Sequence, residues 1–425
     1  MDNCVIPQGY KATALGIIPQ EWEVKFLGNL LSRCANGLTY DVSITSGIPV
    51  TRIETISTGE INYAKVGYIP NESGYETFKM QKGDILYSHI NSLSQIGKVA
   101  YYKGDKEIYH GMNLLLLRAN EGLDKQYLYY TLLTDHMRHM AQVIAKPAVN
   151  QASISTSDLK RVKIAVPPLA EQRKIAEVLG EWDEAIEKQV RLIEKLDLRK
   201  RGLMQRLLSA KLRLPGFSEP WEKVKLGDIG HFLSSNTLSR DCLNEQIGNI
   251  KNIHYGDILI KLPTIVDASF IHIPYVNDDV IVKSDYLKNG DIIFADTAED
   301  YTVGKAIEII NIQAIPVTSG LHTIPFRPKS GIFVNRFLGY YVNSTDYRRQ
   351  LQPLIQGIKV YSISKTALCK TTLKIPTLSE QTAIAEVLTA ADREIELAKE
   401  KLERLHRQKR GLMQQLLSGK KRVKN

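Results

Sequence analysis

The chain has 425 residues, of which 43% are hydrophobic, and it carries a formal net charge of +10. This length predicts at least two domains, and the basic balance favours a polyanionic partner. The apolar runs are too short for a membrane span, and the N-terminal residues lack the pattern of a signal peptide. The 4 cysteines lie far apart without metal-site or disulfide spacing, which is typical of a protein of the reducing cytoplasm.

Residues 15–166, after an N-terminal segment of residues 1–14, have the pattern of a mixed α+β domain. The hexapeptide that begins at Gly83, GDILYS, predicts a turn followed by a buried strand. Residues 124–142 have helical periodicity, and residues 162–166 predict a short closing strand.

Residues 167–213 predict one long helix. Apolar residues recur at heptad spacing from Ile175 to Leu207, after a stop at Pro167 and Pro168. About 40 helical residues span roughly 60 Å at 1.5 Å per residue.

Residues 214–375 repeat the glycine and strand positions of the first domain but have different loops. Gly290 begins GDIIFA, which matches GDILYS, and Arg327 matches Arg118. Residues 89–96 read HINSLSQI, whereas residues 296–303 read DTAEDYTV. One scaffold with two loop sets predicts one task with two specificities.

Residues 376–425 predict a second long helix, which copies the first at a constant offset of 209 residues (Glu171 to Glu380, Met204 to Met413). We expect the two helices to form an antiparallel coiled coil, since so long an apolar seam needs a partner. Ser379 fits the N-cap position. The glycines that recur inside the helices, Gly202 and Gly411, suggest a bend or a close packing contact. The basic residues at the end of the chain are expected to be solvated.

The sequence lacks the loops and motifs of the common nucleotide-dependent and hydrolytic enzymes. It has no phosphate-binding G-x-x-x-x-G-K-[ST] loop, no G-x-G-x-x-G after a strand and no nucleophile elbow. His136 and His139 have no third metal ligand nearby, and Glu23-x-Lys25 has no partner aspartate for a nuclease site. We therefore expect no catalytic residues, no metal and no cofactor in this chain.

The complete pattern resembles the specificity subunit of Type I restriction-modification enzymes. Two variable modules are each followed by a helix of the form P-[PT]-L-x-E-Q…I-A-E-V-L…K-R-G-L-M-Q-x-L-L-S, and the opening Gly9-Tyr10-Lys11…Trp22-Glu23 also fits. The resemblance covers essentially the whole chain.

The resemblance implies two target recognition domains, each of which reads one half of a bipartite, asymmetric double-stranded DNA target. The helices would separate the domains, set the spacer between the half-sites and dock two modification subunits that methylate adenine N6. The restriction subunits would add ATP-driven translocation and cleavage. S-adenosylmethionine, ATP and Mg would then be bound by the partner subunits.

Polar and basic residues in the loop after each GDI strand, and before each Ser-Ile-Ser motif, are the candidates for DNA contact. In the first domain they are Ser88, His89, Asn91, Ser92, Lys98, Lys146, Asn150 and Gln151; in the second they are Asp296, Thr297, Lys305, Lys359 and Tyr361. Asp296 suits base reading, since a carboxylate repels phosphate but accepts a hydrogen bond from cytosine N4. Helix residues outside the seam are the candidates for partner docking: Glu171, Gln172, Gln205, Glu380, Gln381 and Gln414.

Two other functions stay open at this point. A self-contained DNA nuclease or methyltransferase would turn over DNA without a partner protein. A coiled-coil scaffold would show no DNA affinity even in complex with partners.

Overall fold

The computed structural model describes residues 6–148 and 151–423. The chain divides into two compact units. The first unit comprises Met1–Val190 with Lys401–Asn425, and the second comprises Arg191–Glu400. Each unit therefore contains one mixed α+β domain together with parts of both long helices.

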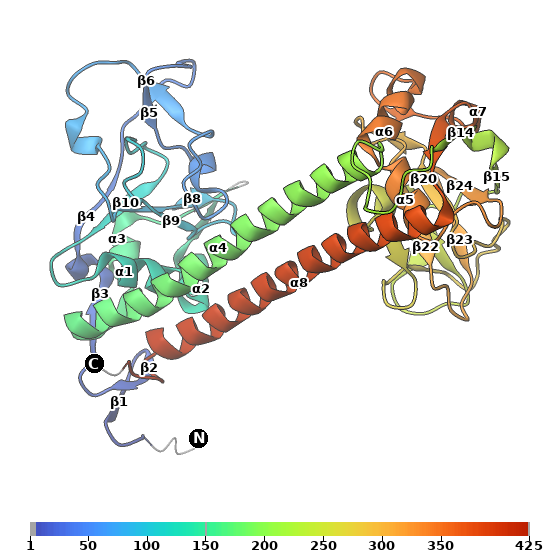
Figure 1. The fold of residues 1–425 in the computed structure, drawn as a ribbon. Coiled ribbons are helices and arrows are strands. Elements are labelled where there is room, and N and C mark those ends of the chain that lie inside the picture. Colours follow the sequence, from blue (N-terminus) through green and yellow to red (C-terminus); the bar gives the residue numbers. More distant parts are fainter. Residues whose placement is uncertain (1–5, 149–150, 424–425) are drawn as a thin grey trace. The chain divides into compact units, whose positions relative to one another are not determined.

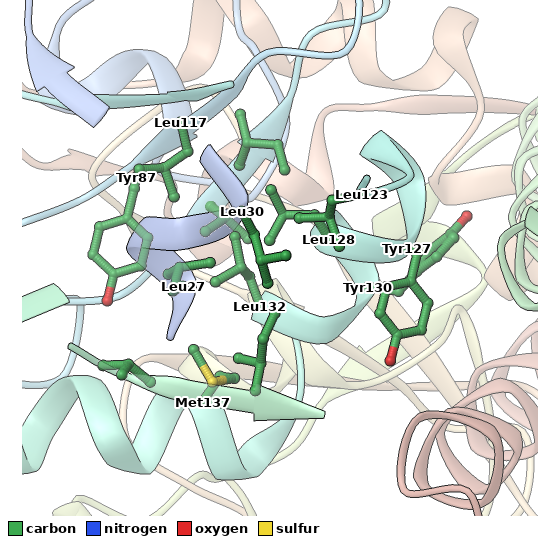
Figure 2. Packing of buried hydrophobic residues seen from close by; sticks show 14 of the residues in the cluster. Leu27, Leu30, Tyr87, Leu117, Leu123, Tyr127, Leu128, Tyr130, Leu132 and Met137 are labelled. Carbon is green, nitrogen blue, oxygen red and sulfur yellow. The ribbon is translucent and has the colours of Figure 1, made fainter. Parts of the chain in front are cut away.

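The first unit is built on a four-stranded antiparallel sheet with three short helices. The sheet order is β4 (Leu31–Asn36), β10 (Leu115–Ala119), β7 (Ile85–Tyr87) and β9 (Val99–Tyr101). The helices are α1 (Lys125–Leu132), α2 (Asp135–Ile144) and α3 (Thr156–Lys160). The core lies between sheet and helices, and Figure 2 shows Leu30, Leu128 and Leu132 among its tightly grouped side chains.

Smaller sheets complete the first unit. They are β1 (Tyr10–Thr13) with β2 (Gly16–Pro19), β5 (Ile48–Val50) with β6 (Gly67–Ile69), β3 (Glu23–Phe26) with β13 (Lys163–Val166), and the three-stranded β11 (Lys146–Ala148), β12 (Gln151–Ser153) and β8 (Ile90–Asn91).

The second unit has a larger main sheet and a second sheet beside it. The main sheet runs in the order β15 (Gly230–Phe232), β24 (Thr323–Pro328), β20 (Ile292–Ala295), β22 (Ala306–Ile310) and β18 (Ile265–Asp267), with β18 parallel to β22. The other sheet contains β16 (Leu243–Asn244), β19 (Tyr275–Val276), β17 (Lys251–Ile253) and β23 (Val317–Ser319). Two strand pairs are β21 (Thr297–Ala298) with β25 (Tyr361–Ser362) and β14 (Glu222–Lys225) with β26 (Thr372–Ile375). The short helices are α5 (Phe337–Val342), α6 (Thr345–Leu351) and α7 (Lys365–Cys369).

The GDI strands are confirmed as buried strands, β7 and β20. In each unit the aspartate of the motif accepts a bidentate ion pair from the arginine that the repeat had matched. Arg118 Nε and Nη2 lie 2.7 Å from the two Asp84 oxygens, and Arg327 holds Asp291 at 2.9 and 2.6 Å. Both aspartates are 1% exposed, so each pair fixes its strand and the turn before it.

The helical stretch predicted at residues 124–142 is divided into the two helices α1 and α2, and α5 and α6 form the equivalent pair in the second unit. Thr134 and Ser344 begin the second helix of each pair, and their hydroxyls accept the backbone N–H of Met137 and Tyr347 at 3.3 Å. A residue that caps a helix start in this way adopts an extended backbone, which interrupts the preceding helix.

The two long helices are α4 (Leu169–Leu207) and α8 (Leu378–Leu417), as the repeat predicted. They are antiparallel within each unit, since Lys409 pairs with Asp183 in the first and Lys200 pairs with Asp392 in the second. Tyr130 donates to Asp183 and Tyr340 donates to Asp392, both at 2.6 Å. The lysines that interrupt the seam therefore join both helices to the adjacent domain.

The heptad seam is used differently along its length. Leu196, Ile395 and Ala398 form a small cluster between the helices in the second unit. Ile175 and Leu179 instead belong to the core of the first domain. The predicted cap at Ser379 is wrong, because α8 begins one residue earlier and Thr377 Oγ1 accepts the Glu380 N–H at 3.4 Å.

Arg422 of the C-terminal segment binds the first unit, which contradicts the expectation that it is solvated, whereas Lys420 and Lys421 are exposed as expected. Lys424 lies outside the described residues. Arg422 forms a bidentate ion pair with Glu171, at 2.6 and 2.9 Å, and a third contact with Glu21 at 2.7 Å. These hydrogen bonds raise the pKa of the guanidinium. The Tyr10 hydroxyl donates to the Gly419 carbonyl at 3.0 Å, and Figure 1 shows the red segment that follows α8 beside β2.

Candidate nucleic-acid interface

The two groups of DNA-contact candidates in the first domain lie on neighbouring strands. The loop after β7 is closed by backbone hydrogen bonds between Ser88 and Lys98 and between Gly97 and Ser88, each 2.8 Å. It contains β8, whose Asn91 pairs in register with Ala152 of β12. Segments some 60 residues apart in the sequence thus form one small sheet at the end of the GDI strand.

The candidates in this sheet differ in accessibility. Ser92, Lys146 and Gln151 are exposed, and Asn91 is half-buried, with its amide donating to Ser88 Oγ at 3.1 Å. Lys98 is half-buried, and its amine donates to the Ser57 carbonyl at 2.7 Å.

Ser88 and His89 are 1% and 5% exposed, so neither side chain is free to reach a ligand in this conformation. Burial lowers the pKa of His89, which favours the neutral imidazole, and Asn36 Nδ2 lies 3.2 Å from its Nε2. Asn150 lies outside the described residues.

The second domain brings the equivalent segments together in the same way. Thr297 and Ala298 of β21 pair with Ser362 and Tyr361 of β25. The Ile363 N–H donates to the Asp296 carbonyl at 2.9 Å, as the Ile154 N–H donates to the His89 carbonyl at 2.8 Å in the first domain. The fold therefore presents the same two segments in both domains, although their side chains differ.

Most candidates in the second domain are accessible. Lys359 is exposed, while Asp296, Thr297 and Tyr361 are half-buried. Tyr361 stacks on Tyr301, with ring centroids 4.9 Å apart. The amine of Lys305 donates to the Leu259 carbonyl at 2.9 Å, and burial is the main cause of its lowered pKa.

The candidates for partner docking divide into buried and exposed residues. Glu171, Gln172, Glu380 and Gln381 are between 1% and 6% exposed, and they attach the helices to the domains of this chain. Glu171 and Glu380 accept the indole N–H of Trp22 and Trp221, each at 3.0 Å. Their burial leaves these four side chains without a surface for an external partner.

Gln172 and Gln381 link the first turns of α4 and α8 to the adjacent domains by hydrogen bonds. Gln172 accepts the Asp124 N–H at 2.8 Å and donates to the Pro167 carbonyl at 2.9 Å. Gln381 accepts the Val334 N–H at 3.1 Å and donates to the Pro376 carbonyl at 3.0 Å.

The remaining docking candidates, Gln205 and Gln414, are exposed near the ends of α4 and α8. The nearby Gly202 and Gly411 lack a close packing contact among the described residues, which was one of the two roles expected of them. A Cβ atom added to Gly202 or Gly411 would meet no atom within 4 Å among the described residues. Packing among the described residues therefore does not explain why a glycine occurs at either position.

Two groups of residues in these sites were missed by the sequence reasoning. Arg213 forms a bidentate pair with Glu380, as Arg422 does with Glu171, and the constant offset of 209 residues relates these arginines as well. His322 lies 3.3 Å from Asp296 and from Thr297. No pattern along the chain pointed to His322, since it comes from a different strand connection.

Across residues 6–148 and 151–423, no helix has the length and apolar character that a membrane crossing requires. The same ranges contain no group of three or more His, Cys, Asp or Glu side chains that could hold a metal ion.

Comparison with known proteins gives a consistent result. Residues 19–196 and 218–407 match the family described as the Type I restriction modification DNA specificity domain. The MjaX specificity subunit of a type I restriction enzyme from Methanocaldococcus jannaschii is 32% identical, over 98% of this chain and 97% of its own.

Two solved structures share the fold. A chain from a structure of complex assembly and conformational transition of the type I R-M system aligns over 95% of this chain and 99% of its own, with a TM-score of 0.59 and 17% identity. The S subunit of a Type-I restriction-modification system from M. genitalium aligns over 93% and 96%, with a TM-score of 0.51 and 18% identity.

Proposed function

Since the chain belongs to the Type I restriction modification DNA specificity family, we propose that each of its two recognition domains reads one half of a bipartite, asymmetric DNA target. The chain is the sequence-recognition component, and residues 15–166 and 214–375 are its recognition domains. The observation that carries the proposal is the duplicated pairing of two loop segments at the end of each GDI strand, with different side chains in each domain. One fold that presents two sets of polar groups suits two different half-sites.

The accessible candidates divide into two roles. Exposed lysines such as Lys146 and Lys359 neutralise phosphates and give affinity that depends on salt but not on sequence. Asn91, Ser92 and Gln151 in the first domain, with Asp296 and Thr297 in the second, carry the donors and acceptors that distinguish base edges. Ser88 and His89 are left out, because their burial makes them supports of the loop.

Two identical partners dock on the helices. Gln205 and Gln414 present the same exposed group once in each unit, and each has a glycine three residues before it, the half-buried Gly202 and the exposed Gly411. A glycine in a helix interior costs about 1 kcal/mol relative to alanine, and among the described residues no atom lies within 4 Å of where the Cβ of either glycine would be. Close approach of a partner's backbone at these glycines offsets it in the complex.

The partners are two modification subunits, which bind S-adenosylmethionine and methylate adenine N6. Restriction subunits join the complex and use ATP and Mg. This chain has no catalytic role of its own, acts in the cytoplasm and sets the spacer between the half-sites through α4 and α8. A change of helix length should therefore change the preferred spacer: one added heptad in both helices lengthens it, and an unchanged spacer refutes this role.

The DNA-reading role is tested with the purified complex of this chain and its modification subunit. Footprinting should reveal two protected half-sites around an unspecified spacer, and methylation sequencing of the host should give the same bipartite motif. A complex that protects no bipartite site overturns the proposal. Cleavage or methylation by the chain alone, with metal and S-adenosylmethionine, would favour a self-contained enzyme instead.

Docking is tested by matched substitutions at the glycines. Gly202→Trp and Gly411→Trp should each remove one of the two modification subunits, which native mass spectrometry counts directly. Glu403→Ala, at an exposed position of α8, is the control and should retain both. Two bound subunits in each tryptophan variant would show that the glycines are not at the contact.

A further inference from the structure

The second unit has a strained histidine in the short connection between β23 and β24. The φ angle of His322 is 54°, in the left-handed region that side chains with a Cβ atom rarely adopt. A conformation of this kind persists only where the surroundings hold it, and it is common at functional sites. The contacts that hold His322 in this conformation, and the groups that its ring faces, are therefore relevant to function.

Two polar side chains of the proposed DNA-reading loop meet this histidine. His322 Nδ1 lies 3.3 Å from Asp296 Oδ1 and 3.3 Å from Thr297 Oγ1, and the Thr297 hydroxyl donates to Asp296 Oδ1 at 2.7 Å. The His322 ring packs edge-on against Tyr255, with centroids 5.3 Å apart. The side chains of His322 and Asp296 are 46% and 26% exposed, so the pair is held on one side and accessible on the other.

The backbone around the pair is fixed from several directions. The Asp296 N–H donates to the His322 carbonyl at 3.0 Å, and the Asp296 carbonyl accepts from Ile363 at 2.9 Å. The Gly320 N–H donates to the Ile253 carbonyl at 2.8 Å, which ties the connection to β17. These bonds fix both residues before any ligand arrives, and such preorganisation is what a recognition site requires.

Buried polar side chains secure the strand that leads into this connection. Thr318 is fully buried on β23, and its hydroxyl donates to Asn252 Oδ1 of β17 at 2.9 Å. Asn236, which is 7% exposed, donates to the same oxygen at 2.8 Å. Hydrogen bonds are stronger where burial excludes water, so these bonds limit movement of β23 relative to β17.

The first domain has different groups at both positions. Counted from the glycine of each GDI motif, His89 corresponds to Asp296; counted from Gly111 and Gly320, Asn113 corresponds to His322. His89 is buried, whereas Asp296 and His322 are accessible. The fold therefore does not require an Asp–His pair, and its presence in the second domain alone fits a difference in what the two domains read.

We propose that Asp296 and His322 together read the exocyclic amino group of a cytosine or an adenine in the half-site of the second domain. The inference rests on the DNA-reading role proposed above and names the residues and the chemical group. A proton on Nδ1 that is directed at Asp296 leaves Nε2 of His322 as an acceptor. Asp296 and His322 then both present acceptors toward the one N–H of cytosine N4 or adenine N6 that base pairing leaves free in the major groove, and the two acceptors share it.

The charge of Asp296 supports a base contact over a phosphate contact. A carboxylate near the DNA backbone is repelled, and only a hydrogen-bond donor on a base edge makes its position favourable. The keto oxygens of guanine and thymine are acceptors and would face the two acceptors of the pair unfavourably.

The test measures binding of the full chain, in complex with its modification subunit, to oligonucleotides that lack single amino groups. Purine replaces adenine, or 2-pyrimidinone replaces cytosine, at each position of the bipartite site in turn. Wild-type binding should fall roughly 10- to 100-fold at one position of the half-site of the second domain. The analogue that causes the loss tells adenine from cytosine.

Two variants and a control complete the design. Asp296→Ala and His322→Gly each remove an acceptor, so these variants should bind equally well with and without that amino group, and the first half-site should be unaffected. Glycine tolerates the left-handed backbone at position 322, so this variant removes the ring without a new strain. Asp278→Ala removes the same charge from an exposed position of the second unit outside this loop and should behave as the wild type.

The inference is overturned if Asp296→Ala and His322→Gly keep the full sensitivity of the wild type at every position. It is also overturned if they weaken binding equally to all DNA, since a purely structural role predicts that result. Failure of the proposed function looks different, because the wild-type complex itself would then bind no bipartite site.

Discussion

The ion pair at the C-terminal end predicts that Arg422 stabilises the first unit selectively. Its guanidinium makes two hydrogen bonds to Glu171, a carboxylate that is only 6% exposed. Arg422→Ala leaves that carboxylate with the Trp22 indole as its remaining hydrogen-bond donor among the contacts described above. Breaking a buried pair costs about 3–5 kcal/mol, and the partial exposure of Arg422 reduces this to about 2–4 kcal/mol.

Hydrogen exchange measured by mass spectrometry is the suitable assay, because it reports each unit separately. A loss of 2–4 kcal/mol corresponds to roughly 30- to 1,000-fold faster exchange of the protected amides. The loss should appear in peptides of the first unit, such as those that cover β3 and β13, and not in the second unit.

The repeat supplies a matched variant and a control. Arg213→Ala removes the equivalent pair with Glu380 and should destabilise the second unit instead. Lys421→Ala removes a neighbouring exposed charge from the same segment and should exchange as the unaltered chain does. Equal protection of the first unit in Arg422→Ala and the full chain would refute a structural role for the C-terminal segment.

Three further predictions concern stability. Ala210 (φ 59°) and Gly419 (φ 70°) occupy equivalent left-handed positions after the long helices. In urea unfolding, Ala210→Gly should stabilise the protein by up to about 1 kcal/mol. Gly419→Ala should destabilise the protein by more than about 1 kcal/mol. Burial raises the pKa of Glu308 from 4.5 to about 7, so the folded state favours the protonated form. The free energy of unfolding of the second unit should therefore fall by on the order of 3 kcal/mol as pH rises from 4.5 to 7. Glu308→Gln should flatten this pH dependence. Lys409→Met removes the amine that pairs with Asp183, which is partly exposed, and should destabilise the first unit by about 1 kcal/mol in the exchange assay, with a smaller effect at high salt.

The internal repeat made the architecture predictable from the sequence. Two long helices and two buried GDI strands lie where the constant offset and the hydrophobic pattern predicted them. Hydrophobic periodicity is a local property, and it survives because each helix or strand must bury one face wherever it lies.

The roles of Glu171 and Glu380 were less predictable. Their recurrence in both copies favoured a surface for an identical partner, yet both are buried against their own domains. Recurrence alone does not distinguish a partner surface from internal packing, because two copies of the same fold pack the same residues in the same way. Trp22 and Trp221 recur together with these glutamates, and that joint recurrence was the available sign of a contact.

Individual loop residues were the least predictable part of the site. Ser88 is polar and follows a strand, but backbone bonds to Gly97 and Lys98 enclose it. His322 reaches Asp296 only because β23 and β24 place a separate connection beside the loop. Side-chain burial in a loop depends on such long-range closure, which composition and spacing do not encode.

The contacts between the helices and the domains explain how the loops can differ while the frame stays the same. In each unit a tryptophan, a glutamate and an arginine join at the start of one helix and the end of the other, and a tyrosine, an aspartate and a lysine join farther along. These side chains lie on the helices, the domain edges and the segments after the helices, away from the loops that follow β7 and β20. A substitution at Asn91 or Asp296 therefore leaves the attachment of the domain intact, so the side chains of these loops can change without loss of the helix frame.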